Sequence, residues 1–253
     1  MPAPNLADLV DSYDAQAASL QAVQAQRVRD ILLVASLYDA FTLSEGKRLT
    51  ELIYGTFYDL WLSSAPTVTR VSTRREALAL LPERRFDLVI TMSQVGDMTA
   101  SEFGLAVKAV RADVPVFLLA YSAEELRVHE GGPVAIAGID RSFIWRGDVR
   151  LFLAMIKLVE DELTADHDAH LAGVRVIVLV EDNVAFYSSY LPMLLTELVR
   201  QTTSLISEEV NLGQRMLRRR LRPKILLATS LEEAWALYTG FRDHLLCVIS
   251  DVE

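Results

Sequence analysis

The chain has 253 residues and is 51% hydrophobic, with only 11 glycines and 8 prolines, a composition typical of packed cores rather than of long disordered segments. Its length suits one large domain or two ordinary ones. The formal net charge of −9 repels a phosphate backbone, so we expect no nucleic-acid partner. The start of the chain has no basic segment followed by an apolar one, and no uninterrupted apolar run approaches about 18 residues. We therefore expect neither a signal peptide nor a membrane span, and a cytoplasmic location.

The first segment, residues 1–29, is predicted to form an amphipathic helix. Its apolar residues recur from Leu6 to Leu20 with a 4-3-4-3 spacing, and Asn5 before them is suited to an N-cap. The same spacing fits a short coiled-coil seam. Packing of this helix onto its own domain and dimerisation through it are both open.

Residues 30–164 alternate short apolar runs with helical patterns. The run from Ile31 to Val34 has the continuous hydrophobicity of a parallel strand that is covered on both faces. An amphipathic pattern over residues 149–163 indicates a closing helix. Strand alternating with helix predicts a doubly wound α/β domain with a parallel sheet. The further strand-like runs are 67–71, 87–91, 116–120 and 142–145.

The pattern restarts after residues 165–173, a polar stretch that we interpret as a linker. Residues 176–180 repeat the first strand, and Glu-Ala-Trp-Ala-Leu at 233–237 repeats Glu-Ala-Leu-Ala-Leu at 76–80. Residues 174–253 are therefore predicted to be a second copy of the domain, which stops after its third strand.

The two copies differ most in a long helical insertion, residues 183–221. A domain of this class would place one helix of roughly 15 residues before its second strand. Pro192, Asn211 and Gly213 favour extended or broken helical structure in the insertion.

Acidic residues follow two strands of the second copy. Glu181 and Asp182 come directly after residues 176–180, and Asp251 ends the third strand. Open α/β sheets bind ligands at the carboxyl ends of their strands, and the first and third strands are neighbours in a sheet of order 2-1-3-4-5. Three converging carboxylates repel one another unless a cation neutralises them, and oxygen ligands suit Mg²⁺. The alternative is that Glu181 and Asp182 belong to a solvated loop.

This arrangement resembles the receiver domain of two-component response regulators, which has a flavodoxin-like sheet of order 2-1-3-4-5. The resemblance implies that Glu181 and Asp182 hold Mg²⁺ and that Asp251 accepts a phosphoryl group. It also implies that the backbone carbonyl of Glu253 completes the metal shell. The implied partners are a sensor histidine kinase or phosphotransfer protein and a downstream effector domain.

The first copy departs from the receiver pattern at every position that carries this chemistry. Ala35 and Ser36 stand at the acidic pair, Met92 at the phospho-acceptor, Ala120 at the hydroxyl position and Trp145 at the lysine position. Apolar side chains hold neither a metal ion nor a phosphoryl group. We therefore interpret residues 30–164 as a pseudo-receiver that is retained for its surfaces.

Other polar groups are interpreted as structural. Asp39, Asp97 and Asp140 are expected to be isolated surface residues in loops rather than a displaced site. The segment 166–170 contains two histidines and two aspartates, and we favour a solvated connector over a zinc site.

A basic cluster and the single cysteine are also given structural interpretations. The cluster is expected to be a solvated helix face, with contact to an acidic partner surface as the alternative. Cys247 lies in an apolar run and is expected to be a buried small hydrophobe. The basic residues are Arg215, Arg218, Arg219, Arg220, Arg222 and Lys224.

A second resemblance concerns the setting of the chain. The phrases at 36–41, 86–92 and 248–252 are similar to the receiver-like N-terminal region of bacterial proteins related to phosphoenolpyruvate synthase or pyruvate phosphate dikinase. The resemblance implies the regulatory front end of a larger protein. The chain itself supplies neither the catalytic histidine nor the nucleotide site of such enzymes, so we expect no enzymatic activity in it.

We accordingly expect a phosphorelay signalling module, with a non-phosphorylated interaction scaffold and an enzyme's regulatory front end as alternatives. Because the second copy stops after its third strand, residues 245–249 would form a bare hydrophobic sheet edge. We expect such a chain to self-associate as a homodimer.

Overall fold

The computed structural model describes residues 27–36, 38–39, 49–59, 65–130, 136–206 and 222–251. Most of the expected leader helix, the second part of the insertion and Glu253 lie outside these residues. The described residues fall into two compact units. The first unit comprises Val28–Val159 with Asp182–Thr196, and the second comprises Glu160–Glu181 with the described part of Glu197–Glu253.

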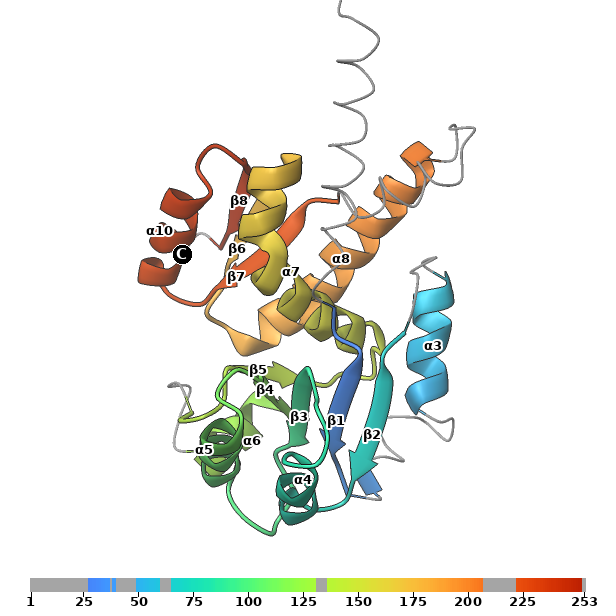
Figure 1. Cartoon of the computed structure of the whole chain (residues 1–253). Helices are drawn as coiled ribbons and strands as arrows, with labels where there is room; N and C mark the ends of the chain where they lie inside the picture. Colours follow the sequence, from blue (N-terminus) through green and yellow to red (C-terminus); the bar gives the residue numbers. More distant parts are fainter. Residues whose placement is uncertain are drawn as a thin grey trace, which may run out of the picture. The chain divides into compact units, whose positions relative to one another are not determined.

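The first unit is built on a five-stranded parallel sheet with the order β2-β1-β3-β4-β5 (Figure 1). The predicted order 2-1-3-4-5 is thereby confirmed. Every residue of β3 and β4 is buried, which explains why β4 is a continuous apolar run in the sequence and why β3 is apolar except for Thr91. The strands are β1 (Asp30–Val34), β2 (Thr67–Val71), β3 (Leu88–Met92), β4 (Val116–Ala120) and β5 (Arg141–Ile144).

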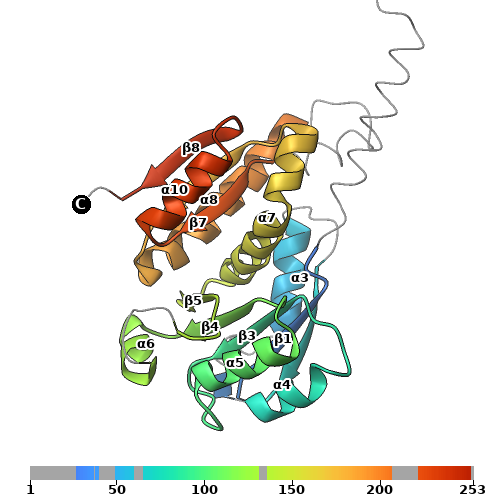
Figure 2. The same cartoon turned by 60° about the vertical axis from the view of Figure 1, so that its left-hand side comes forward.

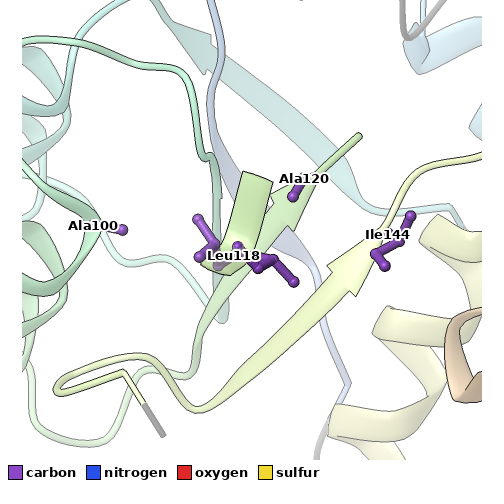
Figure 3. Close-up of a cluster of buried hydrophobic side chains, with 5 residues drawn as sticks. Ala100, Leu118, Ala120 and Ile144 are labelled. Carbon is purple, nitrogen blue, oxygen red and sulfur yellow. The ribbon is translucent and has the colours of Figure 1, made fainter. Parts of the chain in front are cut away.

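Helices connect these strands, as doubly wound topology requires. Thr73 and Thr99 are the N-caps of α4 and α5, and each side chain accepts a hydrogen bond from the backbone N–H three residues later. Figure 3 shows part of the apolar core, in which Ala100 of α5 packs near Leu118 and Ala120 of β4. The helices are α3 (Leu49–Asp59), α4 (Arg74–Leu80), α5 (Ala100–Val110) and α6 (Ala123–Glu130).

The residues that we interpreted as a linker, 165–173, belong almost entirely to helix α7 (Arg150–Ala172), so that interpretation needs correction. Ala165 and Ala169 are fully buried one helical turn apart, and Asp168 between them is buried too. The apolar stripe of α7 thus continues through a stretch that looks polar by composition. The helix ends at Gly173, whose φ of +64° suits a residue without a side chain.

The second unit holds a three-stranded parallel sheet with the order β7-β6-β8. Figure 2 shows its strands β7 and β8 together with helix α10. Its strands are β6 (Val176–Val180), β7 (Lys224–Ala228) and β8 (Leu245–Ser250), and they occupy the places of the first, second and third strands of the first sheet. The parallel sheet predicted for the second copy is thereby confirmed for its first three strands. Helix α10 (Leu231–Gly240) packs its Ala234 and Leu237 against β6 and β7.

The insertion 183–221 begins as one long helix, α8 (Val184–Ile206), which runs through Pro192. The expected extended or broken structure is therefore wrong for residues 184–206. A proline inside a helix costs about 3 kcal/mol because one backbone hydrogen bond is lost. Burial of Tyr187, Leu191 and Leu195, which lie on one face at i+4 spacing, offsets this cost.

Among the described residues, no helix is long and apolar enough to cross a membrane. Cys247 is exposed, which corrects the expectation of a buried thiol. The reason is its position on β8, a strand whose residues from Leu246 onward are exposed and which pairs only with β6 in the described part of the chain. An apolar run predicts a strand, but it does not by itself predict that both faces are covered.

Candidate acidic site

The predicted acidic residues follow two strands that are neighbours in the second sheet. Val180 of β6 pairs with Ser250 of β8, so the next residues, Glu181 and Asp251, leave the sheet side by side. The backbone N–H of Glu181 donates to the carbonyl of Ala228 at 3.0 Å, which extends the pairing with β7 by one residue. Strand register alone therefore brings the two carboxylates to one edge of the sheet.

Asp182 completes the group. One carboxylate oxygen from each of Glu181, Asp182 and Asp251 lies within 4.8 Å of the other two. Glu181 is buried, whereas Asp182 and Asp251 are exposed. The three side chains thus meet in a small acidic cluster, as the sequence predicted. Only its glutamate is buried in the protein. The fourth predicted donor, the carbonyl of Glu253, lies outside the described residues.

Asn183 fixes the chain direction immediately after the acidic pair. Its side-chain oxygen accepts a hydrogen bond from the backbone N–H of Ala185 at 2.9 Å, and its carbonyl accepts from Phe186 and Tyr187. Asn183 therefore begins helix α8, as an asparagine at a helix N-cap does. Asp182 is held between the end of β6 and this cap, so its backbone has little freedom.

In the first sheet, the two positions equivalent to Glu181 and Asp251 carry no carboxylate. Val34 of β1 pairs with Thr91 of β3, so Ala35 and Met92 occupy the places that Glu181 and Asp251 hold in the second sheet. Both are fully buried. Further along the same edge, the backbone N–H of Trp145 donates to the carbonyl of Ala120 at 2.7 Å. These residues form an apolar rim where the second sheet has an acidic one.

A buried arginine, which the sequence analysis did not single out, lies at this edge of the first sheet. Arg74, the first residue of α4, is 1% exposed. Its guanidinium has five N–H donors, and five acceptors of β3 and the following loop receive them. The acceptors are the hydroxyl of Thr91 and the carbonyls of Met92, Ser93, Val95 and Met98.

The repeat between the two domains offered the signal that would have found Arg74. Thr73 and Ser230 are equivalent N-caps, and each accepts a hydrogen bond from the glutamate three residues later. The residue after the cap is Arg74 in the first copy and Leu231 in the second. A positive charge at this position, beside a sheet edge that lacks the acidic cluster of the second copy, points to an internal ion.

Two aspartates of the first domain are buried or engaged, so the expectation of isolated surface residues is wrong for them. Asp39 is 2% exposed, and its carboxylate accepts hydrogen bonds from the Ser36 hydroxyl at 2.6 Å and from the Tyr121 hydroxyl at 3.0 Å. Asp97 accepts from the backbone N–H groups of Arg74 and Arg75. Both hold the chain in place at the carboxyl edge of the first sheet.

The third aspartate, Asp140, also has partners. It accepts a hydrogen bond from the backbone N–H of Val116 at 2.6 Å and lies 2.7 Å from the ammonium of Lys108. Its side chain is partly exposed, but its contacts are to β4 and α5 rather than to the other two aspartates. The displaced acidic site therefore does not form among Asp39, Asp97 and Asp140.

Two members of the predicted basic cluster are buried rather than solvated. Arg222 and Lys224 are 7% and 8% exposed. The guanidinium of Arg222 forms two hydrogen bonds, of 2.8 and 2.9 Å, with the buried carboxylate of Asp161 in α7. The ammonium of Lys224 lies 2.8 Å from Asp168 of the same helix. The remaining arginines of the cluster lie outside the described residues.

No family model and no curated protein matches the chain. Among solved structures, the signal receiver domain of an HD domain-containing protein from Pseudomonas fluorescens Pf-5 is 17% identical, over 57% of this chain and 96% of that domain, with a TM-score of 0.37. The chemotaxis response regulator CheY4 of Vibrio cholerae is 21% identical, over 52% of this chain and 98% of its own, with a TM-score of 0.38.

A third solved structure is a response regulator from Burkholderia pseudomallei, described with a phosphorylated aspartic acid, a calcium ion and citrate. It is 14% identical, over 76% of this chain and 96% of its own, with a TM-score of 0.33. At such low TM-scores the fold assignment rests on the strand order and direction of the two sheets. By that criterion the first unit has a receiver-like fold, and the second sheet has the first three strands of one.

Proposed function

We propose that the chain is a signal-transduction module in which the second unit accepts a phosphoryl group on Asp251. The observation that carries the proposal is the convergence of Glu181, Asp182 and Asp251 within 4.8 Å at the carboxyl edge of a parallel sheet. Three carboxylates in such a small space repel one another unless a cation neutralises them. Parallel sheets of this kind bind their ligands at that edge.

The donor set fits a hard divalent cation. All three side chains offer carboxylate oxygens, and the exposure of Asp182 and Asp251 leaves room for water ligands, which Mg²⁺ retains. Glu181, Asp182 and Asp251 would hold the ion. The ion would supply positive charge that offsets the negative charge of an incoming phosphoryl group.

The transfer itself needs a nucleophile and an accessible approach. An oxygen of the Asp251 carboxylate would attack the phosphorus of a phosphohistidine or an acyl phosphate, and the bond from phosphorus to the donor nitrogen or oxygen would break. The product is an acyl phosphate on Asp251, and the donor leaves with the bonding electron pair. Asp251 suits this role because it is exposed, whereas buried Glu181 does not.

The first unit is proposed to be a non-phosphorylated interaction domain. Ala35 and Met92 supply no carboxylate, and the Arg74 guanidinium already occupies the carbonyl groups that follow β3. This same observation is compatible with the second candidate function, an interaction scaffold in which neither unit is phosphorylated. The two candidates differ only in the chemistry of Asp251.

Metal binding and phosphorylation of Asp251 can be tested on the chain as it stands. We expect Mg²⁺ to bind in calorimetry, and an acyl-phosphate donor with Mg²⁺ to add one phosphoryl group, detected by intact mass spectrometry. Asp251→Asn, which keeps the size of the side chain, should abolish the labelling. Asp243→Asn changes an exposed aspartate before the same strand and should leave the labelling unchanged.

Labelling of Asp251→Asn at the wild-type level would place the acceptor elsewhere and contradict the proposal. Mg²⁺ binding without any labelling would favour the scaffold. If the chain neither binds Mg²⁺ nor is labelled, the acidic cluster has no part in the function.

A further inference from the structure

Two histidines from different elements of the second unit lie against each other. His170 is in the last turn of α7, and His244 is in the turn between α10 and β8. Their ring centroids are 5.2 Å apart and their planes are tilted by 59°. A tetrahedral ion with metal–nitrogen bonds of about 2.0–2.1 Å holds two imidazole centroids roughly 5 Å apart. The spacing therefore matches two ligands of one ion.

Both histidines stand on fixed backbone. The backbone N–H of His244 donates to Phe241 at 2.8 Å, and its carbonyl accepts from the N–H of Val176 at 3.0 Å. His170 precedes the cap of α7, where Gly173 donates to the carbonyl of Ala169 at 3.0 Å. Hence the two rings are brought together by ordered main chain.

The contacts of His170 favour the tautomer that binds a metal through its other nitrogen. Its Nδ1 lies 2.8 Å from the carbonyl of Asp166 and 3.5 Å from the carboxylate of the same residue. A metal-binding histidine usually donates its second ring N–H to such an oxygen, which fixes the ring and makes the ligating nitrogen more basic. With Nδ1 as the donor, Nε2 of His170 carries a free lone pair.

We propose that His170 and His244 form a site for an imidazole-preferring divalent transition ion, of the class of Zn²⁺, Ni²⁺ and Cu²⁺. Water completes the coordination shell, since the side chain of His170 is 62% exposed. Asp166 acts as the oxygen partner of His170 and not as a ligand. A bound ion joins the end of α7 to the turn before β8 and so stabilises the second unit.

The site is chemically distinct from the acidic cluster. The histidines lie at the amino-terminal ends of β6 and β8, because His244 precedes β8 and bonds the first residue of β6. Glu181 and Asp251 follow the opposite ends of these strands. Imidazole nitrogens select transition ions and carboxylate oxygens select Mg²⁺, so the two sites can be loaded separately. This proposal does not rest on phosphorylation of Asp251.

The test uses the tag-free chain with Cys247→Ser, which removes the exposed thiol, and with excess Mg²⁺ to occupy the acidic cluster. Calorimetry with Ni²⁺ or Zn²⁺ should show one saturable site. We expect His170→Ala and His244→Ala each to weaken binding by about tenfold or more. His167→Ala changes an exposed histidine of the same helix and is the matched control; it should bind as the parent does.

Paramagnetic resonance of bound Cu²⁺ supplies a signature that a loss of folding would not imitate. The parent should show coupling to two imidazole nitrogens, and each single alanine variant should show coupling to one. Unchanged far-ultraviolet circular dichroism confirms that each variant is folded. No saturable binding, binding that survives either His170→Ala or His244→Ala, or equal weakening by His167→Ala would each overturn the proposal.

Discussion

Arg74 places a fixed positive charge at the edge of the first sheet, where the second sheet gathers three carboxylates. All five N–H donors of its guanidinium have acceptors, and the side chain is buried. A cation that is part of the chain cannot be exchanged for an external ion. The geometry of the first unit should therefore be independent of divalent cations, whereas the acidic cluster should respond to them.

We predict that Arg74→Met destabilises the first unit by about 2–4 kcal/mol, because buried carbonyl groups of Met92 and Val95 lose their donors. Urea unfolding followed by Trp145 fluorescence measures the free energy of unfolding. The control is Arg75→Met, which changes the next residue, an exposed arginine. This substitution should shift the free energy of unfolding by no more than about 0.5 kcal/mol. Equal effects of the two substitutions would contradict the role given to Arg74.

Tyr187 gives a prediction about alkaline pH. Its hydroxyl donates to the carbonyl of Ser142 at the edge strand β5, and burial raises the pKa of the phenol well above its ordinary value of 10.0. Below the pKa that Tyr187 has in the unfolded chain, the phenol is neutral in both the folded and the unfolded state, so its full contribution to stability is present. Above that pH the phenol ionises in the unfolded state first, so the free energy of unfolding falls as the pH rises.

The free energy of unfolding of the wild type should therefore decline above about pH 10 more steeply than that of Tyr187→Phe. At neutral pH the same substitution should cost about 1 kcal/mol through the lost hydrogen bond. Tyr190→Phe, on the same helix and exposed, should keep the wild-type pH dependence. Chemical denaturation at a series of pH values distinguishes the three proteins, and parallel curves for wild type and Tyr187→Phe would refute the assignment.

Individual residues differ in how far the sequence reveals their position. Glu181 and Asp251 could be predicted to meet because each directly follows an apolar strand. Once the two strands pair in parallel, their register places the two residues side by side. Arg74 and Asp39 could not, since a charged residue in a loop or helix start is normally solvated. Their burial depends on acceptors and donors from β3 and from Tyr121, which are distant in sequence.

At the scale of elements, α7 and β7 are joined by buried ions instead of apolar contacts alone. Asp161 accepts hydrogen bonds from Arg222 and from the backbone N–H of Ile225 at 2.9 Å, which satisfies a donor of this edge strand. The ammonium of Lys224 lies 2.8 Å from Asp168 but donates its hydrogen bond to the Thr164 hydroxyl at 3.0 Å. The contact of Lys224 with Asp168 is thus mainly charge neutralisation.

Lys224→Met should destabilise the second unit by about 3–5 kcal/mol, because it leaves the buried Asp168 carboxylate without its counter-charge. Adding Asp168→Leu removes that charge and should recover most of the loss, since a buried ion pair replaced by apolar residues is often neutral in stability. The double-mutant cycle is measured by urea unfolding. Additive effects of the two substitutions would show that the ions do not interact.

Tertiary contacts also explain why the sequence was a poor guide to α7 and α8. Polar residues at 164–170 resemble a linker by composition, yet Thr164 and Asp168 face Lys224 on a strand about sixty residues away. Pro192 resembles a helix breaker, yet the buried stripe of α8 continues past it. In both helices tertiary contacts decide the outcome, and local propensity does not include them.

At the scale of the whole molecule, the internal repeat was the most informative feature of the sequence. It predicted β6 and β8 as the counterparts of β1 and β3, and both strands are present. The range of β7 was not predicted, because Lys224 at its start was assigned to the basic cluster. The N-caps Thr73 and Ser230 show that the repeat extends to local hydrogen bonding. The exposure of β8 was less predictable from its composition, since an apolar strand is compatible with a central or an edge position.

The exposed β8 leads to a prediction about self-association. Leu246 and Val248 are 53% and 46% exposed, and β8 pairs only with β6 among the described residues. An apolar strand with unpaired backbone groups is a template for pairing with another chain. We predict that this 253-residue chain forms a dimer through β8. A lysine on such an edge opposes pairing, so Leu246→Lys should weaken the dimer by about tenfold or more.

Sedimentation velocity over a range of concentrations measures this equilibrium. Leu105→Lys is the matched control, because Leu105 on α5 has the same exposed fraction, 53%, but belongs to the first unit. The control should sediment as the wild type does, since adding a charge elsewhere on the surface leaves the β8 edge unchanged. A monomeric wild type at high concentration, or equal weakening by both lysines, would show that β8 is not the interface.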